Sequence, residues 1–258
     1  MLIPNCKRFF SALQPTGTEA KRVMLRMKLI TLNIRQGGGK RTTKLLDYLI
    51  EKEADVIVLT EYRHNASGLG IRSALSHVGF QFFASPTNVE NQNSVAIASR
   101  IPFEQHEFPS LLESDRHRVI GARLLGLSIV GVYFSLGAAK QSLYDFFLGN
   151  ELGDLGAEAM IFGDFNTGLH FQDETKATFK LADRFAALPS KGFIDAWRTR
   201  YPERREFSWY SNAGNGFRLD HAFCSEAVNI KIQKIEYDHS PRESKITDHS
   251  ALIVEIRK

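Results

Sequence analysis

Short apolar runs rich in β-branched residues constrain the fold of this chain most. The run DVIVLT at residues 55–60 is almost continuously apolar, which is typical of a strand buried on both faces. Similar runs predict strands at 28–34, 80–84, 94–99, 119–124, 127–134, 159–162, 217–224, 230–237 and 250–256, with a hairpin turn at Leu125-Gly126. Helical spacing predicts a helix starting at Thr42 or Thr43, and helices over 67–78, 139–152 and 174–187. This order predicts an α/β fold in layers, with sheets inside and helices outside.

The composition is that of an ordinary globular protein, and the excess charge lies in one short segment. The 258 residues are 43% apolar and 24% charged. No run approaches the roughly 18–20 apolar residues that a membrane helix needs. Residues 1–26 hold five basic side chains and one acidic one, which accounts for the whole net charge of +4. We expect residues 27–258 to form one domain, residues 1–26 to be an extension outside it, and no membrane partner.

The first 26 residues leave more than one interpretation open. They lack the apolar core and cleavage site of a secretory signal, but they are basic and poor in acidic residues, like organelle-targeting presequences. Alternatively, they are a disordered extension, or they precede a working start at Met27. Cys6 and Cys224 form neither a disulfide framework nor a metal-ligand spacing, which fits a reducing compartment. We expect a cytoplasmic protein.

Polar residues recur where the apolar runs end, and this is the main functional signal. Asn33 ends the first predicted strand, and Glu61 directly follows VIVLT. GDFN at 163–166 follows the strand 159–162, while RLD at 218–220 and TDHS at 247–250 adjoin later strands. Rigid strands that deliver carboxylates, amides and one imidazole to a common edge provide the preorganisation that a functional site needs.

These residue types favour metal-assisted hydrolysis of a phosphate ester. Glu61 and Asp248 supply the oxygen ligands that Mg²⁺ prefers. Asp164 is the candidate base for an attacking water, and Asp220 the candidate partner that holds His249 protonated or correctly oriented. The candidate donors to phosphoryl oxygens are Asn33, Asn166 and His249.

Six motifs occur in the order seen in the endonuclease/exonuclease/phosphatase superfamily, which this chain resembles from Met27 onward. They are TLNI (31–34), VIVLTE (56–61), SVAIASRIPF (94–103), GDFN (163–166), RLDH (218–221) and TDHSAL (247–252). The resemblance implies a four-layer α/β-sandwich with two central, mostly antiparallel β-sheets flanked by helices. It also implies a phosphodiesterase that needs Mg²⁺, or Mn²⁺, and that acts as a monomer.

The resemblance also implies a role for each matching residue. The metal ligands fall on Glu61, Asp248 and Asn33, and the catalytic residues on Asp164, Asn166, Asp220, His249 and Tyr133. Two positions depart from the nuclease pattern. Arg35 stands where similar nucleases often carry Asn or Asp, which removes a metal ligand or adds a phosphate contact. Tyr133 is present, but the Pro-Asn pair that follows it in abasic endonucleases is missing, which leaves its catalytic role open.

The segment 207–220 carries the clearest sign of a substrate. The abasic-site enzymes have aromatic and aliphatic residues at the positions of Trp209, Phe217 and Leu219, and these can line a pocket for a flipped-out sugar or base. Ordinary core packing is the alternative for these side chains. Pairs of arginines at 116/118, 198/200 and 204/205 can follow a phosphate backbone, or can simply be solvated.

Three functions are compatible with these observations. The first is a DNA nuclease, of the abasic endonuclease or 3′–5′ exonuclease type, which implies DNA as partner and a role in DNA repair. The second is a phosphatase or phosphodiesterase for a small molecule or lipid head group, which the neutral body of the domain supports. The third, a binding module without catalysis, is disfavoured because the acidic, amide and histidine residues are all present.

Overall fold

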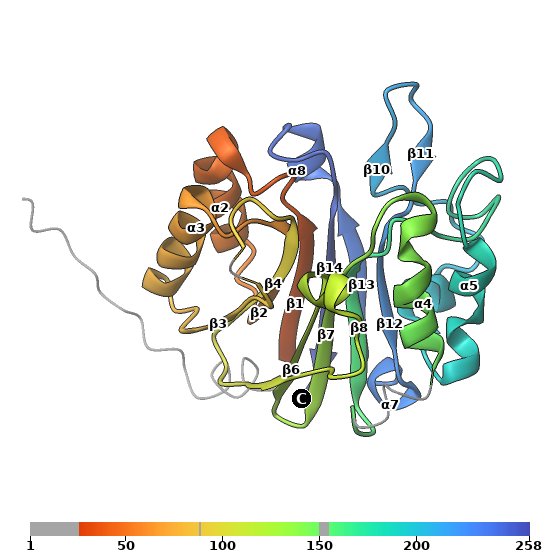
Figure 1. Ribbon diagram of the computed structural model, residues 1–258, viewed down its shortest axis with the longest axis horizontal. Helices are drawn as coiled ribbons and strands as arrows, with labels where there is room; N and C mark the ends of the chain where they lie inside the picture. Colours follow the sequence, from red (N-terminus) through yellow and green to blue (C-terminus); the bar gives the residue numbers. More distant parts are fainter. Residues whose placement is uncertain (1–25, 88, 150–154) are drawn as a thin grey trace, which may run out of the picture.

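Two six-stranded β-sheets lie face to face, with helices covering their outer faces (Figure 1). The computed structural model describes residues 26–87, 89–149 and 155–258. Helices α2 (Thr42–Glu51) and α3 (Ala66–His77) flank one sheet, and α4 (Gln141–Leu148) and α5 (Ala182–Ala187) flank the other. The predicted four-layer α/β-sandwich is confirmed. Residues 1–25 of the predicted extension 1–26 lie outside the described residues, and its last residue, Arg26, belongs to the first strand.

Each sheet contains a single parallel pair, so the two sheets are mostly antiparallel, as predicted. The first sheet has the order β13 (Ile232–Asp238), β14 (Ala251–Arg257), β1 (Arg26–Asn33), β2 (Val56–Tyr62), β4 (Ser94–Ser99), β3 (Phe82–Ala84). The second has the order β5 (Glu104–His106), β6 (Val119–Leu124), β7 (Leu127–Tyr133), β8 (Ala159–Asp164), β12 (Asp220–Cys224), β9 (Ile194–Asp195).

The remaining elements are short. A separate hairpin pairs β10 (Trp209–Tyr210) with β11 (Gly216–Phe217), and the small helices are α6 (Ala196–Arg200), α7 (Glu226–Asn229) and α8 (Ser240–Glu243). No helix in the described ranges is long and apolar enough to cross a membrane.

The apolar runs form the core between the sheets. Val58 of β2, Val95 of β4 and Ile129 of β7 belong to one cluster of fully buried side chains, which draws on both sheets. Two further clusters lie under the helices on the outer faces. Burial on both faces explains why these strands read as continuous apolar runs rather than as alternating patterns.

The strand directions bring the polar strand ends together. Because β1 and β2 are parallel, Asn33 pairs with Thr60 at the carboxyl ends of both strands. In the second sheet β8 runs parallel to β7 and antiparallel to β12, so Asp164 lies opposite both Tyr133 and Asp220. This edge of the sandwich is therefore lined with the polar residues that follow the apolar runs.

The predicted helix over 174–187 is wrong in its first half, since only Ala182–Ala187 is helical. The Glu174 carboxylate accepts hydrogen bonds from the backbone N–H groups of Thr178 and Phe179, at 2.7 and 3.0 Å, and closes a loop. Leu181 has a left-handed φ of 61°, which separates this loop from α5. Side-chain bonds to the backbone competed successfully with helix formation here. The predicted strand 217–224 is likewise interrupted between Phe217 and Asp220.

Candidate active site

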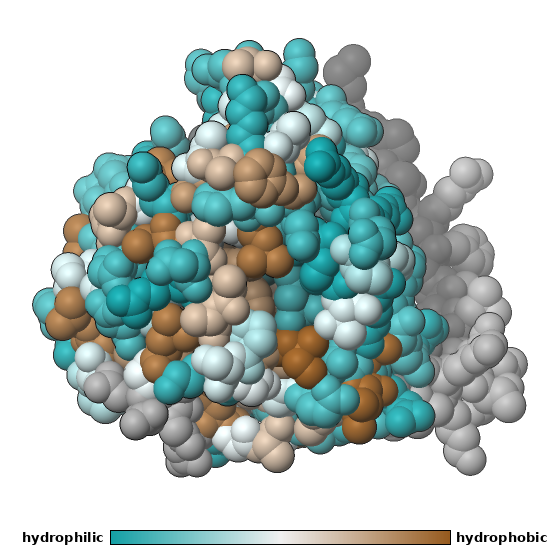
Figure 2. All heavy atoms as spheres, turned by 90° about the vertical axis from the view of Figure 1, so that its right-hand side faces the viewer, coloured by the Kyte–Doolittle hydropathy of each residue, from teal (hydrophilic) through white to brown (hydrophobic). Residues whose placement is uncertain are grey.

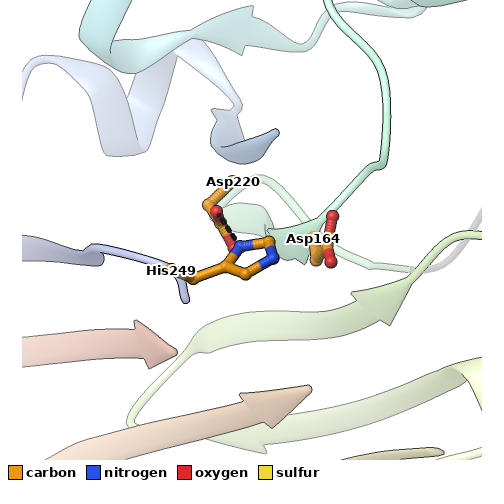
Figure 3. Close-up of side chains that lie close together, drawn as sticks. All are labelled: Asp164, Asp220 and His249. Carbon is orange, nitrogen blue, oxygen red and sulfur yellow. Dashed lines mark hydrogen bonds and ion pairs between the residues drawn. The ribbon is translucent and has the colours of Figure 1, made fainter. Parts of the chain in front are cut away.

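Asp164, Asp220 and His249 form a buried cluster at the polar strand ends (Figure 3). The Nδ1 atom of His249 lies 2.8 Å from Oδ2 of Asp220. Asp164 lies on the side of the imidazole ring away from Asp220, and one ligand atom from each residue falls within 4.8 Å of the others. All three side chains are at most 5% exposed. The predicted pairing of Asp220 with His249 is present in the fold.

Burial and charge set the ionisation of this cluster. Burial alone would lower the pKa of His249, but the adjacent Asp220 carboxylate outweighs it and the pKa is raised to about 10. Burial raises the pKa of Asp164 to about 7, and the like charge of Asp220 adds to this effect. At neutral pH His249 is therefore an imidazolium that donates Nδ1–H to Asp220, while Asp164 is poised near its midpoint, as a general base should be.

Glu61 lies beside this cluster and is held by N–H donors. Asn33 Nδ2 donates to Oε1 of Glu61 at 3.1 Å and to Oδ2 of Asp164 at 2.9 Å, so it links the ends of the two sheets. The backbone N–H of Gln36 and Nδ2 of Asn93 donate to Oε2 of Glu61 at 2.7 and 3.3 Å. Glu61 itself sits at a bulge in β2 with φ 55°, and this left-handed conformation is strained for a glutamate. Such strain at a strand end is common at functional sites.

Asp248 lies at the more exposed side of the site. Its Oδ2 atom accepts a hydrogen bond from Nε1 of Trp209 at 3.4 Å and lies 3.6 Å from Nε of Arg35. Thr247 Oγ1 donates to the backbone carbonyl of Asn33 at 2.6 Å, which ties the TDHS segment to the end of β1. The cation at position 35 thus faces a carboxylate of the site.

Asn166 and Tyr133 complete the site. The backbone N–H of Asn166 donates to Oδ1 of Asp164 at 2.8 Å, and its Nδ2 donates to the carbonyl of Phe134 at 2.8 Å. Asn93 Nδ2 lies 3.5 Å from the Tyr133 hydroxyl. Burial raises the pKa of Tyr133 to about 12, with further contributions from Glu61 and Asp164. Tyr133 is therefore a neutral hydrogen-bonding group.

The predicted aromatic residues adjoin the catalytic cluster at the base of the β10–β11 hairpin. Trp209 pairs across the hairpin with Phe217, with ring centroids 5.7 Å apart, and forms a β-bridge with His249. Leu219 is buried, and its N–H donates to Oγ of Ser208 at 2.9 Å. Figure 2 shows that hydrophilic residues cover most of the projection at the top of the molecule, where Figure 1 places this hairpin.

Only some of the predicted basic pairs are free to meet a substrate. Arg198 donates from Nη1 to the carbonyls of Tyr201, Pro202 and Arg204, and from Nη2 to Asp173 at 2.6 Å. Arg200 is similarly engaged with Asn229 and neighbouring carbonyls. Both arginines therefore hold the chain around α6 together, rather than tracking a phosphate backbone or standing solvated. Arg205 remains exposed.

The donor set fits a divalent cation. Oxygen ligands are available from Glu61, Asp248 and the amide of Asn33, and the buried carboxylates of Asp164 and Asp220 add further oxygen atoms. The Oδ1 atom of Asp220 is buried without a hydrogen-bond partner, so an additional positive group has a carboxylate oxygen to bind. Oxygen-rich sites with few nitrogen ligands suit hard ions such as Mg²⁺ and Mn²⁺.

Sequence reasoning missed two residues that touch this site. Asn93 directly precedes a predicted strand, which was a signal of the same kind as the strand-end residues. Lys140 lies within a stretch predicted to be helical, and no pattern marked its side chain as buried. In the fold it is 1% exposed and its Nζ donates to the carbonyl of Asn166.

Comparison with known proteins agrees with the fold. Among solved structures, a 3′–5′ exonuclease from Neisseria meningitidis superposes with a TM-score of 0.77 at 23% identity, covering 89% of this chain and 99% of that one. A Neisseria 3′ phosphatase bound to a product DNA hairpin gives 0.76 at 22% identity, with the same coverage. An AP endonuclease from Archaeoglobus fulgidus gives 0.73 at 19% identity, covering 88% and 98%. The sequence pattern of the endonuclease/exonuclease/phosphatase family matches residues 30–249, and the chain therefore belongs to that family.

Proposed function

We propose that this protein is a divalent-metal-dependent DNA nuclease that acts at abasic sites or 3′ ends. The observation that carries the proposal is the buried Asp220–His249 pair beside Asp164, located at the foot of a hairpin whose base is the Trp209–Phe217 pair. The first element is a hydrolytic centre for phosphate esters, and the second is an aromatic surface for an unstacked base or sugar.

The residues divide the chemistry between them. In this proposal Glu61, with Asn33 and Asp248, would hold the metal ion, which supplies positive charge to the phosphoryl group when bound. His249 donates from its other ring nitrogen to a phosphoryl oxygen, because Asp220 keeps it protonated. Asp164 accepts a proton from the attacking water. The Oδ1 atom of Asn166 has no protein partner among the described residues and can accept the second hydrogen of the same water.

DNA as the substrate is supported by the neighbours and by the rim of the site. The Neisseria and Archaeoglobus proteins are a 3′ phosphatase with DNA bound, a 3′–5′ exonuclease and an AP endonuclease. In this chain Arg35 and Lys40 are exposed in the segment after β1, and the Nε atom of Arg35 lies 3.6 Å from Oδ2 of Asp248. These cations offset the acidic residues of the site.

A small-molecule or lipid phosphatase is the second candidate, and the loop after β7 favours it. Leu136 stands in that loop, close to Tyr133 in sequence, and is 73% exposed. An apolar side chain in this loop cannot bind a backbone phosphate, but it can pack against an apolar part of a smaller ester.

One experiment separates these functions. A labelled duplex with one abasic-site analogue, an intact duplex and a generic phosphodiester are each incubated with Mg²⁺ and with EDTA, alongside His249→Ala. Metal-dependent incision at the lesion, or 3′ shortening, supports the nuclease. Hydrolysis of the small ester alone moves the substrate to the second candidate. Activity that survives both EDTA and His249→Ala contradicts the assigned site.

A further inference from the structure

Lys140 is a buried cation to which the proposed reaction assigns no role. It closes the 3₁₀ turn Gly137–Lys140 that connects β7 to α4, and its side chain is 1% exposed. Its Nζ atom donates to the backbone carbonyl of Asn166, in the loop that follows β8. Lysines are almost never fully buried unless they are paired, because burying a charged group without a compensating partner costs free energy. Packing alone therefore does not explain the burial of Lys140.

The acceptor of this bond is an unusual part of the backbone. Asn166 has a left-handed φ of 49°, a conformation that is uncommon for residues other than glycine, although asparagine tolerates it better than most. Three contacts hold it: its N–H bonds to Asp164, its Nδ2 bonds to the Phe134 carbonyl, and its own carbonyl receives Lys140. With Nδ2 bonded to the Phe134 carbonyl, the amide orientation is set, and no hydrogen bond among the described residues engages the Oδ1 atom of Asn166, which leaves this oxygen available to a ligand.

The position of the ammonium also explains why a cation is present rather than a neutral donor. Asp164 and Asp220 are two buried carboxylates in one cluster, and each disfavours the charge on the other. Burial lowers the pKa of Lys140 to about 8, while the charge of Asp164 opposes that shift. An ammonium group that interacts with Asp164 opposes this repulsion, which a neutral donor would not do.

We propose that Lys140 is a positioning residue, which fixes the Asn166 turn so that the Asn166 amide oxygen and the Asp164 carboxylate orient the attacking water. The side chain is too buried to touch the substrate, so it acts through Asn166. The proposal rests on the hydrolytic function proposed above, and it adds a residue from the β7–α4 loop to the catalytic arrangement. It requires that loss of Lys140 lowers turnover and leaves substrate affinity nearly unchanged.

The test compares Lys140→Met with Ser142→Ala. Ser142 lies two residues further along the same segment and bonds through its Oγ to Asp115 rather than to the Asn166 turn, so it is a matched control for a lost hydrogen bond. For Lys140→Met we expect kcat to fall about 10- to 100-fold with KM within about threefold, because small displacements of an orienting group have effects of this size. Ser142→Ala should keep the wild-type kcat. Lys140→Gln, which keeps an N–H donor, should retain more of the wild-type kcat than Lys140→Met; if Lys140→Met does not fold, Lys140→Leu, which also lacks the donor, takes its place.

A double-mutant cycle tests whether Lys140 acts through Asn166. In an Asn166→Ala background, Lys140→Met should lower kcat by no more than about threefold, because the group it positions is already absent. A full loss in that background, or a wild-type kcat in Lys140→Met, overturns the inference while the nuclease proposal stands. A wild-type protein that hydrolyses none of the three substrates overturns the proposed function and this inference with it.

Discussion

Replacing Arg218 by methionine should destabilise the protein strongly, and the loss should depend on pH in a direction that identifies its cause. Arg218 is fully buried, and its guanidinium donates to Asp173 Oδ1 at 2.7 Å and to Asp195 Oδ2 at 2.6 Å. These contacts join three segments: the loop after β8, the start of α6, and the residues that lead into β12 and Asp220.

The expected magnitude follows from what the substitution leaves behind. Methionine fills much of the same volume, but Asp195 and Asp173 then lose the cation that both share. Removing one partner of a buried ion pair costs about 3–5 kcal/mol. Total stabilities of single domains are about 5–15 kcal/mol, so Arg218→Met should remove a large share of the stability at pH 7.

The dependence of stability on pH that comes from Asp173 and Asp195 should have the opposite sign in Arg218→Met from its sign in the wild type. In the wild type, burial would raise the pKa values of Asp173 and Asp195, but Arg218 lowers both below 3.8. Their contribution is therefore present above the unfolded pKa and is lost only as the pH falls through the lower folded values. In the variant, burial acts with less opposition and the folded pKa values rise. Stability should then decrease as the pH rises above about 4, so the deficit at pH 7 should shrink at pH 5.

Urea unfolding at pH 5, 6, 7 and 8 measures this difference. Arg200→Met is the matched control, because Arg200 makes its hydrogen bonds to neutral acceptors, including Asn229 Oδ1 at 2.7 Å. Its deficit should be smaller and nearly independent of pH. A deficit below about 1 kcal/mol for Arg218→Met, the value typical of exposed pairs, would refute the reasoning. So would a deficit that grows toward pH 5.

Three further predictions concern the site. Asp220→Asn should lower kcat about 10²- to 10³-fold at pH 7.5, because His249 then loses the carboxylate that does most to oppose its burial and its pKa falls; an NMR titration of the ring checks this, and a pKa still near 10 would contradict it. Glu61→Gln should weaken Mn²⁺ binding at least about tenfold by calorimetry, since a charged ligand is lost; equal affinity would place the ion elsewhere. Trp209→Ala should raise KM for DNA about tenfold through lost stacking, yet leave hydrolysis of a small phosphodiester within about threefold; equal effects on both substrates would assign the ring to structure alone.

The sequence revealed the strands, and with them the catalytic edge, because both depend on local patterns. A run such as VIVLT has few alternatives to a buried strand, and the polar residue that ends it must lie at the edge of a sheet. Asp164, Asp220 and His249 could be grouped in this way before their distances were known, and the fold brings them within 4.8 Å. The functional roles assigned to them stay predictions until the variants are measured.

The tertiary structure decided what depends on contacts between distant segments. Glu174 closes a loop where helical spacing predicted a helix, because its carboxylate found backbone donors. Arg198 and Arg200 donate their hydrogen bonds to backbone carbonyls, to Asp173 and to Asn229. Their charge alone had suggested that they bind a phosphate backbone or are solvated. Lys140 is buried because the loop after β7 and the loop after β8 meet around it. The sequence of either loop alone does not predict this contact. Apolar periodicity is a property of one stretch of chain and can be read from its sequence. The partner of a charged side chain depends on which distant segments pack beside it, so it is determined only by the tertiary structure.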